Sequence, residues 1–157
     1  MATAAIKPDV ALAQSTSLKD IETGVSVSAE DAAEIWVMLD KYLDNYRQTL
    51  AERIDKHIET LLFPHVRIAS HQVVVLPDAK SYRDAALRLE SYMVSDWDYS
   101  KWAKRKIVQA DKEKVHVVVT FNRYRKDNSL IASENSLYIL EKINGHWGIR
   151  GRSSFAK

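Results

Sequence analysis

Two arginines near the end of the chain have the type and spacing to bind an anion. Arg150 and Arg152 lie in the stretch "NGHWGIRGRSS" and are separated by a single glycine. Side chains two positions apart in a β-strand point to the same face, so we expect both guanidinium groups on one side of a terminal strand. Such a pair can clamp a carboxylate through bidentate hydrogen bonds. The competing interpretation is that they pair with Glu134 and Glu141 or lie in an interface.

Acid–base chemistry has weaker candidates. Glu134 lies within a predicted central strand, where a dry environment would raise its pKa. His71 could pair with Asp78, and Tyr46 lies on a predicted helix. The five histidines form no H-x-H pair and no i,i+4 pair, and the chain has no cysteine. We therefore predict no metal site and no cofactor.

Composition limits the class of protein. The chain has 157 residues, which favours one domain. The 23 basic and 21 acidic side chains leave a formal net charge of only +2, which argues against a nucleic-acid-binding surface. The first residues lack the pattern of a signal peptide, and no apolar run approaches the length of a membrane span. We expect a cytoplasmic protein with no nucleic-acid or membrane partner.

Helical periodicity follows a less regular N-terminal segment, residues 1–28, which we interpret as an arm. Ser28 is a favourable N-cap, with Asp31 three positions after it. Apolar residues then recur at helical spacing: Trp36, Leu39, Leu43, Tyr46, Leu50, Ile54, Ile58, Leu61 and Leu62. Pro64 is expected to end this run. Periodicity allows either one long helix or two with a bend near residues 48–51.

The second half of the chain is predicted to be mostly β-strand. Two short strands surround a turn between Ala69 and Gln72, and a third helix follows Pro77, capped by Asp78. Long strands are expected at residues 102–109, 114–126, 130–143 and 146–155, with hairpin turns at 127–128 and 144–145. Helices followed by a meander of strands indicate an α+β domain over residues 29–157.

Alternation divides these strands into two faces. One face is apolar and carries Val115, Val117, Val119, Phe121, Trp147 and Ile149. The other is mixed and carries Thr120, Asn122, Tyr124, Arg150, Arg152 and Ser154. The predicted strand 130–143, which lies between the other two in sequence, can face either way. Different turn lengths would place either Ser136 and Tyr138 or Asn135 and Leu137 beside the apolar set. Apolarity alone would bury the apolar face under the helices.

The order of these elements resembles a known superfamily. A helix pair ending in "LLFPHVRI", a third helix, then "VHVVVTFNRYRKDNS" and "SLYILEKINGHWGIRGRSS" are similar to the nuclear transport factor two-like superfamily. Within it, the SnoaL-like and ketosteroid-isomerase-like branch fits best, over residues 28–155. The resemblance implies a cone-shaped, curved antiparallel sheet around a cavity that about three helices cover, a cystatin-like fold.

The resemblance also implies which face is inside. Members commonly dimerise through the outer face of the sheet. When the hairpins of this sequence are aligned with the family pattern, the mixed face lines the cavity. The resemblance therefore implies these ligand-binding residues: Arg150, Arg152, Asn122, Thr120, Tyr124 and Ser154. The apolar face would then form a homodimer contact, contrary to the assignment from apolarity alone.

Steroid-type isomerisation is disfavoured. That chemistry needs a carboxylate base and a second carboxylic acid beside a tyrosine, and the two acid positions fall near Ser70 and near Leu137 or Tyr138. We therefore expect a domain that binds a small organic molecule, with an anion favoured by the arginines. The alternatives are a lyase, isomerase or hydrolase that uses Tyr46, His71 or Glu134, and a non-catalytic dimerisation module.

Overall fold

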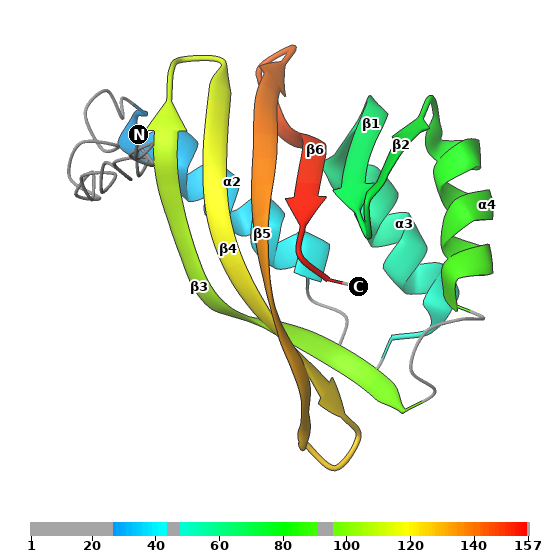
Figure 1. The fold of residues 1–157 in the computed structure, drawn as a ribbon. Coiled ribbons are helices and arrows are strands. Elements are labelled where there is room, and N and C mark those ends of the chain that lie inside the picture. Colours follow the sequence, from blue (N-terminus) through cyan, green and yellow to red (C-terminus); the bar gives the residue numbers. More distant parts are fainter. Residues whose placement is uncertain (1–26, 44–47, 91–95, 157) are drawn as a thin grey trace, which may run out of the picture.

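Helices precede most of the strands in the computed structural model, which describes residues 27–43, 48–90 and 96–156 (Figure 1). The helices are α2 (Ala29–Leu43), α3 (Leu50–Thr60) and α4 (Ala79–Glu90). The strands are β1 (Leu61–Ala69), β2 (Gln72–Leu76), β3 (Trp97–Ala110), β4 (Lys114–Arg125), β5 (Leu130–Ile143) and β6 (His146–Ser154). This order confirms the predicted α+β class, whereas the predicted arm at residues 1–28 lies almost entirely outside the described residues.

Side-chain caps start the first two helices. The backbone N–H of Asp31 donates to Oγ of Ser28 at 3.0 Å, which confirms the predicted start of α2. Thr49 and Glu52 form a capping box at the start of α3, so two separate helices replace the single long helix that periodicity allowed. Tyr46 lies outside the described residues.

The second helix ends earlier than predicted. Thr60 is its last residue, and Leu61 begins β1, where it is in register with Ile149 of β6. Pro64 therefore lies within a strand and does not terminate the helix. Leu61 fits the helical stripe and the sheet equally well by type, but only the sheet brings it against β6. Pairing between residues far apart in sequence decided the boundary.

The six strands form one sheet in the order β2-β1-β6-β5-β4-β3. All neighbouring pairs are antiparallel except β1 and β6, which are parallel, so the expected curved antiparallel sheet is confirmed apart from this one pair. β3 is longer than predicted and has three register shifts against β4. Such bulges bend a strand and increase its twist, consistent with the curvature of β3 and β4 in Figure 1.

The helices cover one side of the sheet, which we call the inner face. Val115, Val117 and Val119 of β4 are fully buried there, in register with Leu140, Tyr138 and Ser136 of β5. The apolar sets of β4 and β6 therefore share the inner face, as does the Ser136 and Tyr138 alternative for β5. The assignment taken from the superfamily pattern, with the apolar set outside, was wrong, because this core is where the apolar side chains of the helices are buried.

Candidate functional site

A β-bulge separates the two arginines that the sequence placed on one face. Leu140 is in register with Ile149, and the preceding residue Ile139 is in register with Gly151, so Arg150 is the extra residue of β6. An extra residue reverses the alternation beyond it. Arg152 therefore lies on the inner face with Ile149, and Arg150 lies on the outer face. The predicted clamp between Arg150 and Arg152 is not formed.

Arg150 is neutralised where it lies. Its Nε donates to Oε2 of Glu141 at 2.7 Å, and its NH1 donates to the carbonyl oxygen of Pro64 at 3.2 Å. Glu141 also forms an ion pair with Lys114 at 3.8 Å. The competing interpretation, in which a glutamate pairs with an arginine of the terminal strand, holds for Arg150.

Arg152 is held on the inner face by uncharged groups. Its Nε donates to Nε2 of His65 at 3.2 Å, and its NH1 donates to the Tyr42 hydroxyl. A side-chain hydrogen bond also links it to Tyr138, and its guanidinium carbon lies 5.3 Å from the centre of the Tyr42 ring. These contacts fix the position of the guanidinium, but none of them supplies a negative charge.

Two histidines near Arg152 are neutral. His65 is fully buried, and its Nδ1 donates to the carbonyl oxygen of Ile149 at 3.1 Å. Burial and the positive charge of Arg152 lower the pKa of His65 to about 4. His57 stacks on Tyr42 at 4.5 Å between ring centres, and its Nδ1 lies 2.7 Å from the Tyr82 hydroxyl. Burial, with Arg152 next, lowers the pKa of His57 to about 3.

A second arginine lies beside Arg152. Arg67 of β1 is directly in register with Arg152 of β6, so their side chains leave the same face of neighbouring parallel strands. Burial, followed by the charge of Arg152, lowers the pKa of Arg67. None of the ion pairs found in the described parts of the chain includes either arginine. The inner face thus holds two adjacent, partly buried positive charges.

The remaining predicted ligand-binding residues divide between the two faces. Ser154 lies on the inner face, where its Oγ accepts a 2.8 Å hydrogen bond from Ser136. Thr120, Asn122 and Tyr124 lie on the outer face of β4, opposite the buried valines. Thr120 donates to Asn135 at 2.8 Å, and Asn122 donates to the Tyr124 hydroxyl at 3.0 Å. The structure therefore brings together Arg152 and Ser154 from the predicted set.

The weak acid–base candidates do not converge. Glu134 is on the inner face, in register with Phe121. His71 is exposed in the two-residue turn between β1 and β2, where its φ is 63°. Tyr46 lies outside the described residues. Among the described residues, no group of three or more histidine, aspartate or glutamate side chains could hold a metal ion, and no helix is long and apolar enough to cross a membrane.

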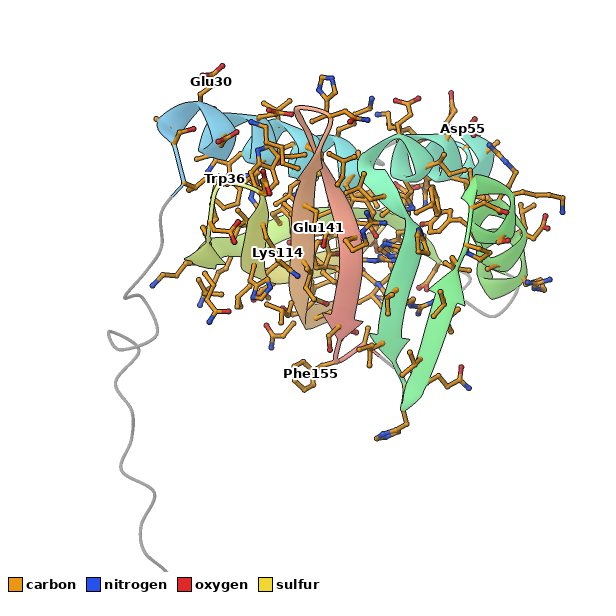
Figure 2. The ribbon with its side chains drawn as sticks, turned by 90° about the horizontal axis from the view of Figure 1, so that it is seen from above. Glu30, Trp36, Asp55, Lys114, Glu141 and Phe155 are labelled. Carbon is orange, nitrogen blue, oxygen red and sulfur yellow. The ribbon has the colours of Figure 1, made fainter. Side chains whose placement is uncertain are left out.

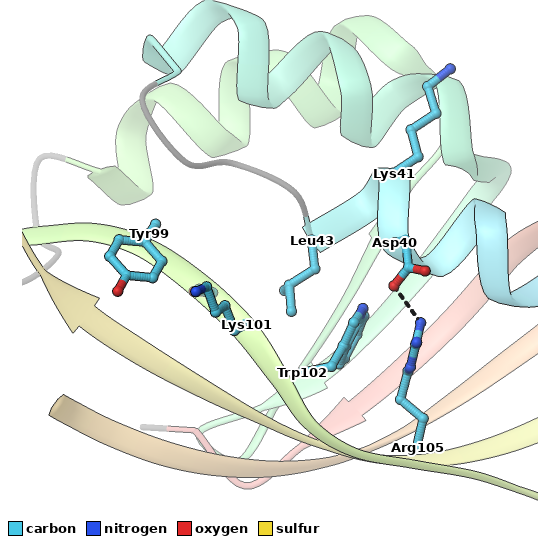
Figure 3. Close-up of a pocket in the computed structure, with 8 residues that line it drawn as sticks. Asp40, Lys41, Leu43, Tyr99, Lys101, Trp102 and Arg105 are labelled. Carbon is cyan, nitrogen blue, oxygen red and sulfur yellow. Dashed lines mark hydrogen bonds and ion pairs between the residues drawn. The ribbon is translucent and has the colours of Figure 1, made fainter. Parts of the chain in front are cut away.

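A pocket of about 500 Å³ lies at a different place, between the end of α2 and β3 (Figure 3). Leu43, Tyr99 and Trp102 form its apolar lining. Arg105 at its edge is paired with Asp40 at 2.6 Å, and its guanidinium carbon lies 5.7 Å from the centre of the Trp102 ring. The charge of this arginine is therefore already balanced, which distinguishes the pocket from the inner face around Arg152.

The model of the family "NTF2-like protein (DUF6841)" matches residues 29–154. The chain belongs to this NTF2-like family. The superfamily expected from the sequence is therefore confirmed, and the match covers the whole described sheet. A search of curated proteins found no significant match.

Solved structures confirm the NTF2-like fold at low sequence identity. A protein of unknown function with a cystatin-like fold, from Nostoc punctiforme PCC 73102, matches with a TM-score of 0.69 and 12% sequence identity, and the match covers 85% of this chain and 96% of that one. A ketosteroid isomerase-like protein from Erwinia carotovora atroseptica SCRI1043 has a TM-score of 0.60 and 15% sequence identity, and the match covers 82% of this chain and 97% of that one. A putative calcium/calmodulin dependent protein kinase II association domain from Xanthomonas campestris has a TM-score of 0.57 and 16% sequence identity, and the match covers 87% of this chain and 96% of that one.

Sequence reasoning missed most of this NTF2-like site. Arg67, His57, Tyr82 and Tyr138 were not among its candidates. One signal was present, since "VRI" places an arginine between two β-branched residues of a predicted strand. The closeness of Arg67 to Arg152 depends on the parallel pairing of β1 with β6, which no local sequence pattern predicted.

Proposed function

We propose that this protein binds a small organic anion on the inner face of the sheet, through Arg67 and Arg152. The observation that carries the proposal is the adjacency of these two guanidinium groups without an ion-pair partner among the described residues. Like charges brought together and partly removed from water disfavour the folded state. A carboxylate between them would offset that cost and accept charge-assisted hydrogen bonds from both.

The pocket between α2 and β3 is a weaker candidate for the same ligand. Its arginine is already paired with Asp40, so an anion there would have to compete with a carboxylate of the protein. At Arg152 the hydrogen-bond partners are two tyrosines and a neutral histidine. Those groups orient the guanidinium while leaving its charge available.

Binding is favoured over acid–base catalysis at this site. A general base needs a free lone pair within reach of the substrate proton. Both ring nitrogens of His65 are engaged, one with Ile149 and one with Arg152. His57 is likewise engaged, with the Tyr82 hydroxyl and with the backbone of Tyr42.

Thermal unfolding with added small carboxylates, including aromatic acids, tests the proposal. A ligand present at about 100 times its Kd stabilises the folded state by about 2.7 kcal/mol, which for a chain of this size is about 5–10 °C in Tm. We expect this shift in the wild type and in Arg150→Gln, which alters the outer face, and its loss in Arg67→Gln and Arg152→Gln. Absence of any shift in the wild type, or equal shifts in all three variants, would contradict the proposal.

We also propose that two copies of the chain associate through the outer face of the sheet. An outer patch, defined here by its aliphatic and aromatic side chains, consists of Val66, Ile68, Val73, Val75, Val118, Leu137, Ile139 and Phe155. Val73 is 69% exposed, Val75 58% and Phe155 83%. Figure 2 shows Phe155 on the side of the sheet away from α2 and α3. A sheet face exposed to water normally carries polar residues at such positions.

A second copy suits this patch because the patch is itself a sheet face. Between its apolar strands, β6 offers the small residues Gly151 and Ser153 on the same face, so the surface is free of bulky side chains at its centre. Two such faces can pack against each other as the layers of a β-sandwich do. Apolar patches of this kind mark association surfaces in soluble proteins.

Sedimentation velocity distinguishes this association from other uses of the patch. We expect a dimer for the wild type and a monomer for Ile68→Lys, because two lysines would be buried in a symmetric contact. Val37→Lys is the matched control, since Val37 is 69% exposed on α2, on the other side of the molecule. A monomeric wild type, or a dimer that survives Ile68→Lys and not Val37→Lys, would contradict the proposal.

A further inference from the structure

The aromatic ring of Phe155 is exposed although its backbone is held in place. Phe155 directly follows β6 and is 83% exposed on the outer face of the sheet (Figure 2). Its backbone N–H donates to the carbonyl oxygen of Asn135 at 3.0 Å. On either side of it, Ser154 is hydrogen-bonded to Ser136, and Ala156 is buried. The course of an ordered backbone therefore holds this ring out into water.

A row of small residues precedes Phe155 on the same face of β6. Gly151 is buried at the floor of this row, and Ser153 is half-buried. A Cβ added to Gly151 would meet, within 4 Å and apart from its chain neighbours, only Val66. Strands β1 and β5 flank β6 and are about 10 Å apart, which leaves room for the edge of an aromatic ring between their side chains. We call this strip the trough, and its walls are Val66, Ile68, Leu137 and Ile139.

The positions of Phe155 and Gly151 suit a two-fold symmetric contact. In such a contact, if one residue of the first copy touches another of the second, the reverse contact also forms. When the β6 strands of two facing copies run in opposite directions, with the axis level with Ser153, Phe155 of each copy lies over Gly151 of the other. If the strands ran in the same direction, the two Phe155 rings would meet and the two troughs would stay unfilled, which is poor packing.

We propose that Phe155 anchors the contact between two copies, with its ring inserted into the partner's trough above Gly151. This inference rests on the association through the outer face proposed above, and it adds the anchoring residue and the relative direction of the two β6 strands. Aromatic side chains dominate the binding energy of many interfaces. A side chain carried on an ordered backbone also loses less conformational freedom when it binds.

The dissociation constant of the dimer, measured by sedimentation over a dilution series, tests the anchor. Phe155→Ala removes the ring twice in a symmetric contact, so we expect the dissociation constant to rise at least about thirtyfold. The matched control is Leu87→Ala, because Leu87 is 49% exposed on α4, and its dissociation constant should stay within about twofold of the wild type. Thermal unfolding of each variant verifies that it is folded.

A compensating pair tests where the ring inserts. Gly151 has no positive φ and has space for a side chain in the single copy, so Gly151→Leu should fold and should weaken the dimer by filling the trough. Adding Phe155→Ala to Gly151→Leu should then lower the dissociation constant at least about fivefold relative to Gly151→Leu alone, because the leucine fills the space that the ring vacates.

The outcomes separate this inference from the association on which it rests. A dimeric wild type whose dissociation constant is unchanged by Phe155→Ala would overturn the anchor and leave the association in place. Additive weakening by Phe155→Ala and Gly151→Leu would overturn the insertion above Gly151. A wild type that is monomeric at every concentration would overturn the association itself.

Discussion

Arg152 donates its Nε–H to Nε2 of His65 over 3.2 Å, between two parallel neighbouring strands. Nδ1 of the same ring faces the Ile149 carbonyl oxygen at 3.1 Å, so this nitrogen carries the proton and Nε2 is the acceptor. The imidazole thus joins β1 to β6 and orients the guanidinium. A protonated His65 could not accept from Arg152, which explains physically why this histidine must remain neutral.

Replacing His65 should destabilise the fold. His65→Gln is expected to lower the free energy of unfolding by about 1–3 kcal/mol, because at least one buried polar group on β6 loses its partner. Urea unfolding measures this. The matched control is His71→Asn in the β1–β2 turn, where asparagine tolerates the positive φ and the free energy should change by less than about 0.5 kcal/mol. Equal effects of the two substitutions would contradict the role given to His65.

The free energy of unfolding should decrease as the pH falls below 6.5. In the unfolded chain both histidines take up a proton near pH 6.5, whereas the folded protein keeps His65 neutral to about pH 4 and His57 to about pH 3. The unfolded state binds more protons in this window, so acid favours it. Between pH 7 and pH 5 the loss should be about 2 kcal/mol per histidine.

Urea unfolding at pH 7, 6 and 5 measures this loss, and the range avoids most carboxylate titration. The slope should be smaller in His65→Gln and unchanged in His71→Asn. A stability that is flat across this range in the wild type would show that the two histidines are not held neutral by burial.

Asp31 should anchor α2 to the sheet. Its Oδ1 accepts from Nζ of Lys142 at 2.6 Å and from Nε1 of Trp147 at 2.9 Å. These bonds, Lys142 first, then Trp147 and Ser28, lower the pKa of Asp31 to about 2. The stabilisation is present above the unfolded pKa of 3.8 and is lost as the pH falls toward 2.

Asp31→Asn is therefore expected to lower Tm at pH 7, with the difference from the wild type disappearing near pH 2. Circular dichroism melting curves at both pH values measure it. Glu30→Gln, a change in the adjacent exposed acid, should leave Tm nearly unchanged at pH 7. A deficit of Asp31→Asn that is the same at both pH values would mean that the carboxylate charge does not contribute.

Gly148 should tolerate no side chain while Leu62 remains in place. A Cβ at this position would lie 2.6 Å from Cγ of Leu62, so Gly148→Ala is expected to cost about 1–3 kcal/mol of unfolding free energy. Leu62→Ala should relieve the clash, and the double variant should be less destabilised than the sum of the two single changes. Strict additivity in urea unfolding would exclude the steric explanation.

Local patterns in the sequence determined much of the fold. The α+β class, the N-cap at Ser28 and the two-residue turn at Asn144 and Gly145 all follow from short-range chemistry, since caps and turns depend on a few neighbouring residues. The alternation of valines in β4 also indicated correctly which face the helices cover. In this protein apolarity was a better guide to the inner face than the superfamily pattern, because burial of that face supplies the core.

The tertiary structure alone decided which charged residues meet. One bulge residue in β6 moved Arg150 to the outer face, where Glu141 neutralises it, and kept Arg152 on the inner face. The parallel pairing of β1 with β6 then brought Arg67 beside Arg152. Alternation within a strand is a local property, but bulges and pairing between distant strands depend on the whole sheet. For that reason the sequence could predict an arginine of the right type to bind an anion, whereas only the tertiary structure determined which residues surround it.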